Sequence, residues 1–406
     1  MIKAPNAKKI LVIRYRFIGD TILTVPFLRN LRNSYPDAQI DVLVGPQSGE
    51  VLEGCPYVDK LIVYDTTRFH KYDSGEGDKK SFWSYVFSLR KERYDTAFVL
   101  KRSWSSALLA LLIGARTRVG YATEGRQILL THHVPHLTNM HEVDSTLSVL
   151  ESAGIAVSDR FLEGFVNDFE QEQIEALPEW QQLARATKKV LIHAPAAHPD
   201  KLYPIESWAE IVKILSEQHG YLPVFTGAKQ DIELYERLQD LAGAKGVNLA
   251  GRLTLRLSLA LYANLDLAIC TDSGPAHLAA AAGIPTVALF GPTDPVRWRP
   301  FSAIKSDKQR ALRSGQERTS HAICATADSG TGKSSSGKTG KGKYGNETAG
   351  ALAKNDIGEN EAVYMADLPC RPCYYNKTCI DRPCLKDLSA QVVVERALSL
   401  YRRWQE

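Results

Sequence analysis

Several small and polar residues crowd the start of one predicted helix, within the segment TDSGPAHLAAAAGIP that begins at Thr271. An apolar run, residues 267–270, precedes this segment and is typical of a buried strand. A helix start free of bulky side chains offers unpaired backbone N–H groups and the positive end of the helix dipole, which favours a phosphate site. The alternative is an ordinary strand-helix-strand unit packed through alanines. The residues concerned are Asp272, Ser273, Gly274, Pro275 and His277.

Two charged residues that follow predicted strands can also take part in chemistry. Asp20 comes after Gly19, just beyond the first apolar strand, so its carboxylate can act as a general base on a hydroxyl group. The alternative for Asp20 is a plain helix cap. Lys201 lies in the loop HPDKLYP, where an ammonium group can hold a diphosphate. The alternative for Lys201 is a solvated surface lysine.

A cysteine cluster near the C-terminus has the spacing C-x2-C-x5-C-x4-C. Four thiols this close can bind zinc tetrahedrally, and a disulfide pair or a reduced packing cluster are the alternatives. The spacing departs from common zinc patterns, and no neighbouring base indicates a catalytic thiol. The four residues are Cys370, Cys373, Cys379 and Cys384.

A formal phosphate-loop pattern, Gly332 followed by Gly337-Lys338-Thr339, lies in a run rich in Gly, Ser and Lys. That pattern binds nucleotide only between a strand and a helix, and neither is predicted here, so we interpret the match as coincidence. The composition of the run cannot bury enough apolar surface to order itself. It predicts a flexible insertion over residues 306–361.

Composition and charge limit the classes of protein. The net charge of +4 is too small to indicate nucleic-acid binding by itself. The sequence lacks the run of about 18 apolar residues that a membrane span needs, and its start lacks the apolar core of a signal peptide, so we expect a cytoplasmic protein. Several arginines near predicted loops can meet an anionic acceptor or lie in solvent: Arg14, Arg16, Arg102, Arg116, Arg118 and Arg126.

The elements that must position these residues alternate between strand and helix. The first series opens with a strand at 9–14 and a helical stretch at 20–34 that Pro26 interrupts. A second series begins at residue 189 and contains the segment around Thr271. Such alternation predicts an α/β protein of two halves, each a parallel sheet covered by helices, with ligands at the carboxyl ends of the strands.

These residues resemble one family, the heptosyltransferases of glycosyltransferase family nine. The stretch ILVIRYRFIGDTILTVPFLRNLRNSYPDAQI is similar to the family's opening motif, and DSGPAHLAAAAGIPTVALFGPTDPVRWRP resembles its most specific signature. The segment FTGAKQD and the lysine loop match in order, and CRPC resembles the tail of some members. Where the family often reads Lys-x-Trp-Pro, this chain reads Lys201-Leu202-Tyr203-Pro204.

The resemblance implies a GT-B architecture, in which two Rossmann-like domains face each other across a cleft. It implies an acceptor-binding domain over residues 1–165, a linker at 166–188 and a nucleotide-sugar-binding domain over 189–388 that carries the insertion. It also implies a C-terminal helix, residues 389–406, that packs back towards the first domain.

The resemblance further implies an inverting transfer of heptose from ADP-heptose to the lipopolysaccharide inner core, with no metal or other cofactor. By motif position, Asp20 would be the general base on the acceptor hydroxyl. The residues implied to bind the donor are Lys201 at the diphosphate, Ser273, Gly274 and Pro275 at the helix end, Asp272 and His277 at the sugar and phosphate, and Asp231 near the ribose.

The implied partners are a nucleotide-sugar donor and a lipopolysaccharide or lipid A-core acceptor, and not nucleic acid. We expect the protein in the cytoplasm, with peripheral association at the cytoplasmic face of the inner membrane, where lysines of the insertion can attract anionic lipid. Two alternatives stay open. One is a nucleotide-sugar epimerase of similar fold, which acts without an acceptor, and the other is a sugar-nucleotide-binding protein without turnover.

Overall fold

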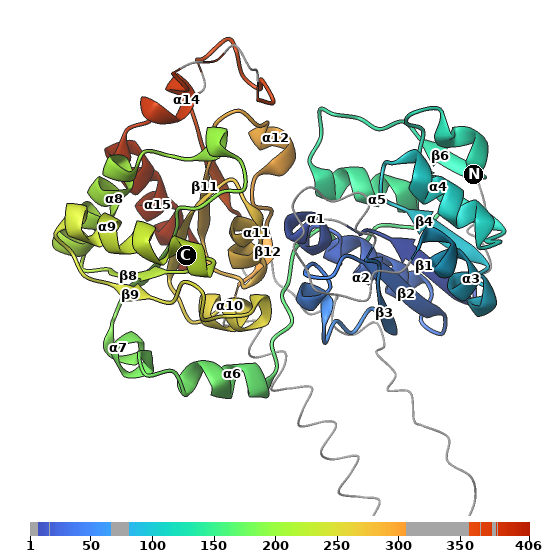
Figure 1. The fold of residues 1–406 in the computed structure, drawn as a ribbon, viewed down its shortest axis with the longest axis horizontal. Coiled ribbons are helices and arrows are strands. Elements are labelled where there is room, and N and C mark those ends of the chain that lie inside the picture. Colours follow the sequence, from blue (N-terminus) through green and yellow to red (C-terminus); the bar gives the residue numbers. More distant parts are fainter. Residues whose placement is uncertain are drawn as a thin grey trace, which may run out of the picture.

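Two parallel sheets, built from successive parts of the chain, organise the structure (Figure 1). The computed structural model describes residues 7–15, 17–65, 81–305, 357–365, 367–375, 379 and 381–406. Arg16, residues 306–356 of the predicted insertion and the phosphate-loop pattern at 332–339 lie outside the described residues.

The first sheet has six strands in the order β3-β2-β1-β4-β5-β6, and all neighbouring strands are parallel. Its central strands are buried almost throughout, as expected for a parallel sheet with helices on both faces. The strands are β1 (Lys9–Ile13), β2 (Gln39–Val44), β3 (Lys60–Val63), β4 (Thr96–Val99), β5 (Thr117–Tyr121) and β6 (His132–Val134).

The second sheet also has six parallel strands, in the order β14-β11-β10-β7-β8-β9. Read from β9, this order repeats that of the first sheet. The strand order therefore reverses between β1 and β4 in one sheet and between β7 and β10 in the other, and ligands of such sheets bind beside these points. The strands are β7 (Lys189–His193), β8 (Leu222–Phe225), β9 (Val247–Asn248), β10 (Leu267–Thr271), β11 (Thr286–Leu289) and β14 (Glu361–Val363).

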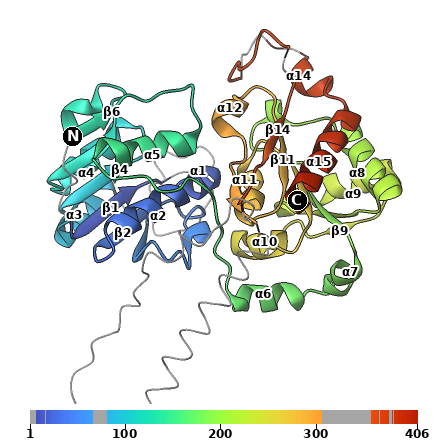
Figure 2. The ribbon, with the colours of Figure 1, turned by 180° about the vertical axis from the view of Figure 1, so that it is seen from behind.

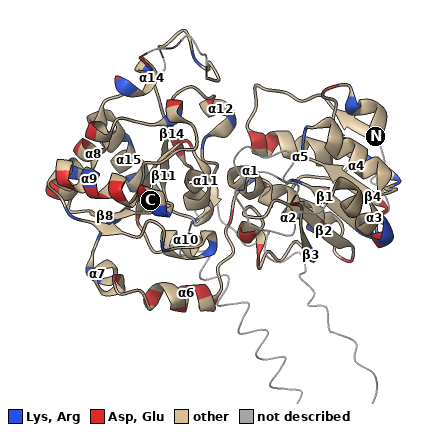
Figure 3. Cartoon of the chain, viewed as in Figure 1, with Lys and Arg blue, Asp and Glu red and all other residues tan. Residues whose placement is uncertain are grey.

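Helices surround both sheets, and α1 packs against α11 where the two halves meet (Figures 1 and 2). Acidic and basic residues are interspersed over both halves (Figure 3). Among the described helices, none combines the length and apolarity needed to cross a membrane. The α-helices are α1 (Ile18–Ile22), α2 (Val25–Ser34), α3 (Phe82–Glu92), α4 (Trp104–Leu112), α5 (Glu142–Ser152), α6 (Asp168–Glu175), α7 (Trp180–Arg185), α8 (Ile205–His219), α9 (Ile232–Ala242), α10 (Leu255–Tyr262), α11 (Gly274–Ala281), α12 (Pro295–Trp298), α14 (Pro383–Lys386) and α15 (Ala390–Gln405). Short 3-10 turns are η1 (Glu50–Leu52), η3 (Arg126–Leu129), η4 (Pro199–Lys201) and η5 (Lys229–Asp231).

The predicted helical stretch at 20–34 is two helices, α1 and α2, and Pro26 is the second residue of α2. Proline is tolerated in a first helical turn because its missing N–H would have no partner there. Phe17 is the N-cap of α1, so Asp20 lies inside the helix and is not its cap.

The C-terminal helix α15 corrects one prediction. Instead of packing back towards the first domain, its apolar face is buried against α8 and the strands β10, β11 and β14 of the second sheet. The amphipathic pattern predicts which face is buried, but it does not say which surface receives that face. The buried residues are Val393, Val394, Ala397, Leu400 and Trp404.

The C-terminal boundary of the predicted insertion also needs correction. Two of its last residues form β13 (Ile357–Gly358), which pairs antiparallel with β12 (Ala303–Ile304), and β14 then joins the second sheet beside β11. The indole Nε1 of Trp404 donates to the carbonyl of Glu359 at 2.7 Å, and Lys305 Nζ donates to the carbonyl of Trp404 at 2.6 Å. The end of α15 therefore fastens this two-stranded ribbon.

The contact between α1 and α11 predicts a cost for any side chain at Gly19. A Cβ there would lie 2.7 Å from Cδ2 of the buried His277 ring, so one of the two groups would have to shift. We expect Gly19→Ala to lower the free energy of unfolding by about 1–3 kcal/mol, measured by urea unfolding.

Gly274→Ala is the matched control on the facing helix, because its Cβ would lie 3.4 Å from Cβ of Ile18, a far looser contact. Both replacements gain the same helix propensity. A Gly19→Ala variant as stable as Gly274→Ala would contradict the contact.

Candidate active site

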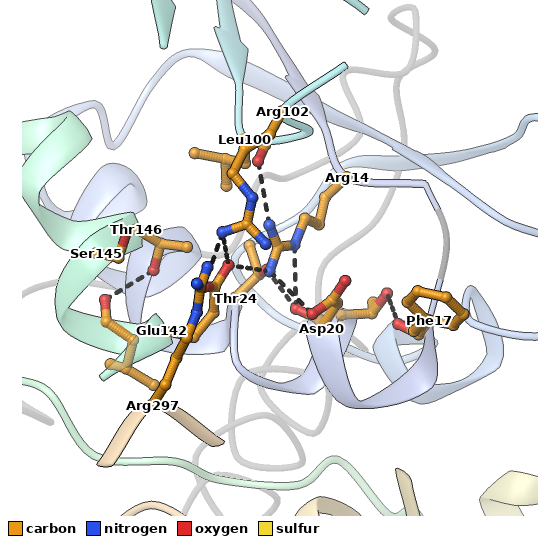
Figure 4. A network of polar contacts seen from close by, with 12 residues as sticks. Arg14, Phe17, Asp20, Thr24, Leu100, Arg102, Glu142, Ser145, Thr146 and Arg297 are labelled. Atoms are coloured by element: carbon orange, nitrogen blue, oxygen red, sulfur yellow. Dashed lines mark hydrogen bonds and ion pairs between the residues drawn. The ribbon is translucent and has the colours of Figure 1, made fainter. Parts of the chain in front are cut away.

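Asp20 lies just past the carboxyl end of β1, beside the point where the strand order of the first sheet reverses. Its side chain is 18% exposed, and its Oδ1 is 3.4 Å from Nη2 of Arg14 (Figure 4). Arg14 Nε also donates to the backbone carbonyl of Asp20 at 3.3 Å, and Thr24 Oγ1 donates to the same carbonyl at 2.8 Å. Side chain and backbone of this residue are thus both held, while part of the carboxylate still reaches solvent.

Lys201 and Asp272 occupy the corresponding place in the second sheet, after β7 and β10. Lys201 Nζ is 2.7 Å from Asp272 Oδ2 and donates to the Asp272 carbonyl at 3.1 Å. Thr293 Oγ1 donates to the same carboxylate oxygen. The Lys201 side chain is only 18% exposed. Its ammonium group is therefore fixed by the buried Asp272 and is not free in solvent.

The start of α11 lacks a side-chain cap from its N-cap residue. Ser273 is the N-cap, but its hydroxyl donates to the Thr271 carbonyl at 3.2 Å and makes no side-chain cap to the helix. Gly274 and Pro275 are the first two helical residues. Pro275 has no N–H and the Ala276 N–H donates to the Ser273 carbonyl at 3.1 Å, so this helix end offers an anion the helix dipole and the N–H of Gly274.

His277 joins the two halves. Its ring is buried and touches Gly19, the residue before Asp20. Burial lowers the pKa of His277 to about 4, against the opposing pull of the Asp272 and Asp20 carboxylates, so the imidazole is neutral at neutral pH. The structure thus brings Asp20 to the helix that carries Ser273, Gly274 and Pro275.

A buried ion cluster beside Asp20 was not predicted from the sequence (Figure 4). Glu142, the first residue of α5, is fully buried and accepts from Arg14 Nη2 at 2.9 Å, Arg102 Nη1 at 2.9 Å and Arg297 Nη2 at 3.2 Å. Burial opposes ionisation of Glu142, but the three arginines outweigh it and lower its pKa. The one sequence signal was helical spacing, which places Glu142 on the same face as buried Thr146.

His136 completes this cluster. Its Nε2 is 2.9 Å from Arg102 Nη1 and 2.8 Å from Arg297 Nη2. Burial and then the two guanidinium charges lower the pKa of His136 to about 4, so the ring is neutral and Nε2 accepts from both arginines.

Most of the predicted loop arginines are bound inside the protein. Arg14 and Arg102 belong to the Glu142 cluster. Arg126 is buried and donates to the Tyr121 carbonyl at 2.8 Å, and Arg118 donates to the Leu129 carbonyl at 2.7 Å. Of these five described arginines, only Arg116 is exposed. These arginines are therefore mostly neither solvated charges nor free contacts for an anionic acceptor.

Two other predicted features make structural hydrogen bonds in the described residues. Asp231 Oδ2 accepts from the backbone N–H of Ala228 at 2.7 Å, which closes its own turn after β8. Tyr203, which replaces the family's common tryptophan, is buried and donates to the Leu388 carbonyl at 2.6 Å. Its phenol therefore ties the lysine loop to the chain before α15.

The predicted cysteine cluster shows no disulfide. All of its thiols are free; Cys384 is buried, Cys373 is half-buried, and Cys370 and Cys379 are exposed. Within the described ranges, no group of three or more His, Cys, Asp or Glu side chains is arranged to hold a metal. Neither the zinc site nor the disulfide is therefore supported.

Two sheets of identical strand order, with charged residues beside both reversal points, define a protein of the GT-B type. Among solved structures, ADP-heptose lipopolysaccharide heptosyltransferase II of E. coli is similar with a TM-score of 0.64 and 21% identity, over 98% of this chain and 100% of that one. A glycosyl transferase of family 9 from Veillonella parvula has a TM-score of 0.63 and 25% identity, over 72% and 83%.

The chain belongs to glycosyltransferase family 9 (heptosyltransferase), whose model matches residues 82–326. Lipopolysaccharide heptosyltransferase 3 of Escherichia coli is 29% identical over 306 residues, which cover 71% of this chain and 84% of that protein. Lipopolysaccharide core heptosyltransferase OpsX of Haemophilus influenzae is 24% identical over 305 residues, covering 73% and 82%. The chain is therefore a glycosyltransferase, and the epimerase alternative is not retained.

Three buried histidines predict that mild acid destabilises the fold. Burial lowers the pKa of His193 and His277 to about 4 and that of His141 to about 3. Unfolded histidine titrates near pH 6.5, so between about pH 6.5 and 4 the unfolded chain binds protons that the folded chain does not. The free energy of unfolding must then fall with pH, by roughly 2 kcal/mol per histidine at pH 5.

Urea unfolding at pH 7.5 and pH 5 measures this loss. Carboxylates such as Glu142 lower the free energy of unfolding only below about pH 4.3, where they gain protons in the unfolded chain. His277→Gln, which removes one of the three buried rings, should reduce the pH dependence. An unchanged pH dependence in His277→Gln would contradict the prediction.

Proposed function

We propose that the chain transfers heptose from ADP-heptose to a lipopolysaccharide inner-core acceptor, with inversion at the anomeric carbon. The observation that carries the proposal is the meeting of α1 and α11. It brings Gly19, the residue before Asp20, against the start of α11, and the Lys201–Asp272 pair lies at the same edge of the second sheet as that start. The relatives' names support the sugar and the acceptor: they are lipopolysaccharide heptosyltransferases, and one similar structure is E. coli heptosyltransferase WaaC with ADP.

In the proposed reaction, the Asp20 carboxylate takes the proton of the acceptor hydroxyl. The acceptor oxygen then attacks the anomeric carbon from the side opposite the diphosphate, and the bond from that carbon to the diphosphate oxygen breaks. ADP leaves with the electron pair. Lys201 and the positive end of the α11 dipole, with the backbone N–H of Gly274, stabilise the negative charge that develops on it. Every step uses side chains and backbone of this chain, without a metal or other cofactor.

The remaining roles follow from the same placement. Asp272 holds Lys201 towards the donor site, and Ser273, Gly274 and Pro275 form the helix start that faces the diphosphate. His277 is a neutral, buried neighbour of both carboxylates and packs the two halves together. Asp231 Oδ2 already accepts from the Ala228 N–H, so the other oxygen of this carboxylate would contact the ribose. Because the proposed acceptor is anchored in lipid, we place the enzyme peripherally at the cytoplasmic face of the inner membrane.

Asp20→Asn tests the base. We expect acceptor-dependent release of ADP from ADP-heptose to fall by about a hundredfold or more, since an amide cannot take the proton. Asp144→Asn, on the outer side of α5 beside Arg160, is the matched control and should keep the wild-type rate.

A rate near wild type in Asp20→Asn would overturn the assignment of the base. No ADP release by the wild-type protein with any acceptor would instead favour the alternative of a binding protein without turnover.

Lys201→Ala tests the diphosphate contact. A charge-assisted hydrogen bond contributes about 1.5–3 kcal/mol, so we expect ADP-heptose to bind at least about tenfold more weakly, measured by calorimetry. Lys213→Ala, at an exposed lysine of α8, should bind as the wild type does.

Lys201→Ala leaves the buried Asp272 carboxylate without its cation, so the double variant with Asp272→Asn separates folding from binding. The double variant should regain the melting temperature but not the affinity. Wild-type affinity in either variant would count against the role of Lys201.

A further inference from the structure

Arg297 reaches from the second half of the molecule into the first. It lies in α12, a short helix after β11 whose start is capped by Asp294, which accepts from the N–H of Val296 at 2.9 Å. The Arg297 side chain is buried, and its Nη2 lies 3.2 Å from Glu142 Oε2 and 2.8 Å from His136 Nε2. Both of these partners belong to the first half, so the contact exists only while the halves are together.

On the first-half side, the contact leads to Asp20 through two groups. Glu142 Oε2 faces Arg297, and Glu142 Oε1 faces Arg14 Nη2 at 2.9 Å (Figure 4). The same Nη2 is 3.4 Å from the Asp20 carboxylate. Glu142 is buried, and several guanidinium groups share its two oxygens. Loss of one guanidinium group therefore changes the position of the carboxylate relative to the remaining guanidinium groups.

On the second-half side, the same segment leads to the proposed diphosphate contact. Thr293, four residues before Arg297, donates to Asp272, and Asp272 in turn fixes Lys201. The cap of α12 limits how far Thr293 and Arg297 can move apart. One short stretch of chain therefore touches both Asp272, which fixes the cation proposed for the leaving group, and the ion cluster beside the proposed base.

We propose that Arg297 is a positioning residue, which joins the Lys201–Asp272 pair to Asp20 through Glu142 and Arg14 and so holds the base in its reactive orientation while the two halves are together. The proposal rests on the proposed function, because it presumes that Asp20 is the base. Arg297 touches neither Asp20 nor the donor contacts directly. Its replacement should therefore impair turnover without an equal loss of donor binding.

The test compares Arg297→Ala and Arg297→Lys with Arg299→Ala. Arg299 is the matched control: it lies next to α12, its side chain donates to the Val296 carbonyl at 3.3 Å, and its contact with His141 uses only the backbone carbonyl, at 2.9 Å. Both replacements with alanine remove one cation from the same turn. Acceptor-dependent ADP release gives kcat and KM, calorimetry gives the affinity for ADP-heptose, and thermal unfolding gives the melting temperature.

For Arg297→Ala we expect kcat to fall by about ten- to a hundredfold, as misplacement of a reacting group by about 1 Å does. The affinity for ADP-heptose should stay within about threefold of the wild type, and Arg299→Ala should keep its kcat. Arg297→Lys should recover part of the rate, because an ammonium can still meet Glu142. Guanidinium ion added to Arg297→Ala should restore part of its kcat and leave Arg299→Ala unchanged.

Three results would overturn the proposal: a kcat for Arg297→Ala equal to that of Arg299→Ala, a loss of affinity as large as the loss of kcat, or absence of rescue by both lysine and guanidinium. The last two would define Arg297 as a structural contact between the halves. Asp20→Asn keeps the two hypotheses apart. If Asp20→Asn is inactive while Arg297→Ala turns over normally, the proposed function stands and only the role of Arg297 falls.

Discussion

The arrangement of the two halves depends on one close approach, in which the backbone of Gly19 lies against the ring of His277. A residue without a side chain is needed on one helix, and a flat, neutral ring fills the space on the other. This contact also places the proposed catalytic groups, because Asp20 follows Gly19 directly and the start of α11 precedes His277 by one turn. Packing and chemistry are thus fixed by the same few atoms.

The buried charges beside this contact have a different physical character. A carboxylate without solvent is costly, and Glu142 is tolerated because several guanidinium groups surround it. One of these, from Arg297, comes from the opposite half. Separation of the halves would leave Glu142 with fewer partners and would expose a cationic cluster to water. The interface therefore favours one defined arrangement over many loosely packed ones.

The sequence predicted the two-sheet fold, the central strands and the residues beside the reversal points, because those features rest on local patterns: apolar runs, helix-start chemistry at Ser273 and Gly274, and strand-helix alternation. It did not predict the partners of Glu142 or the location of α15. Arg14, Arg102 and Arg297 lie far apart in the chain, and only the register of two sheets and the angle between them bring their guanidinium groups to one carboxylate. The amphipathic pattern of α15 would suit either half, and the structure shows Trp404 packed beside β13.

The ribbon of β12 and β13 makes the position of β14 independent of the length of the connection between them. Residues 303–304 and 357–358 are paired across it, and Trp404 and Lys305 hold its base, so the chain departs from the second sheet and returns to it at one anchored point. The free energy of closing a connection depends only weakly on its length once its ends are fixed. Evolution can therefore lengthen or shorten the chain at this place without moving β14, and an experimenter can use the same position to attach a reporter domain.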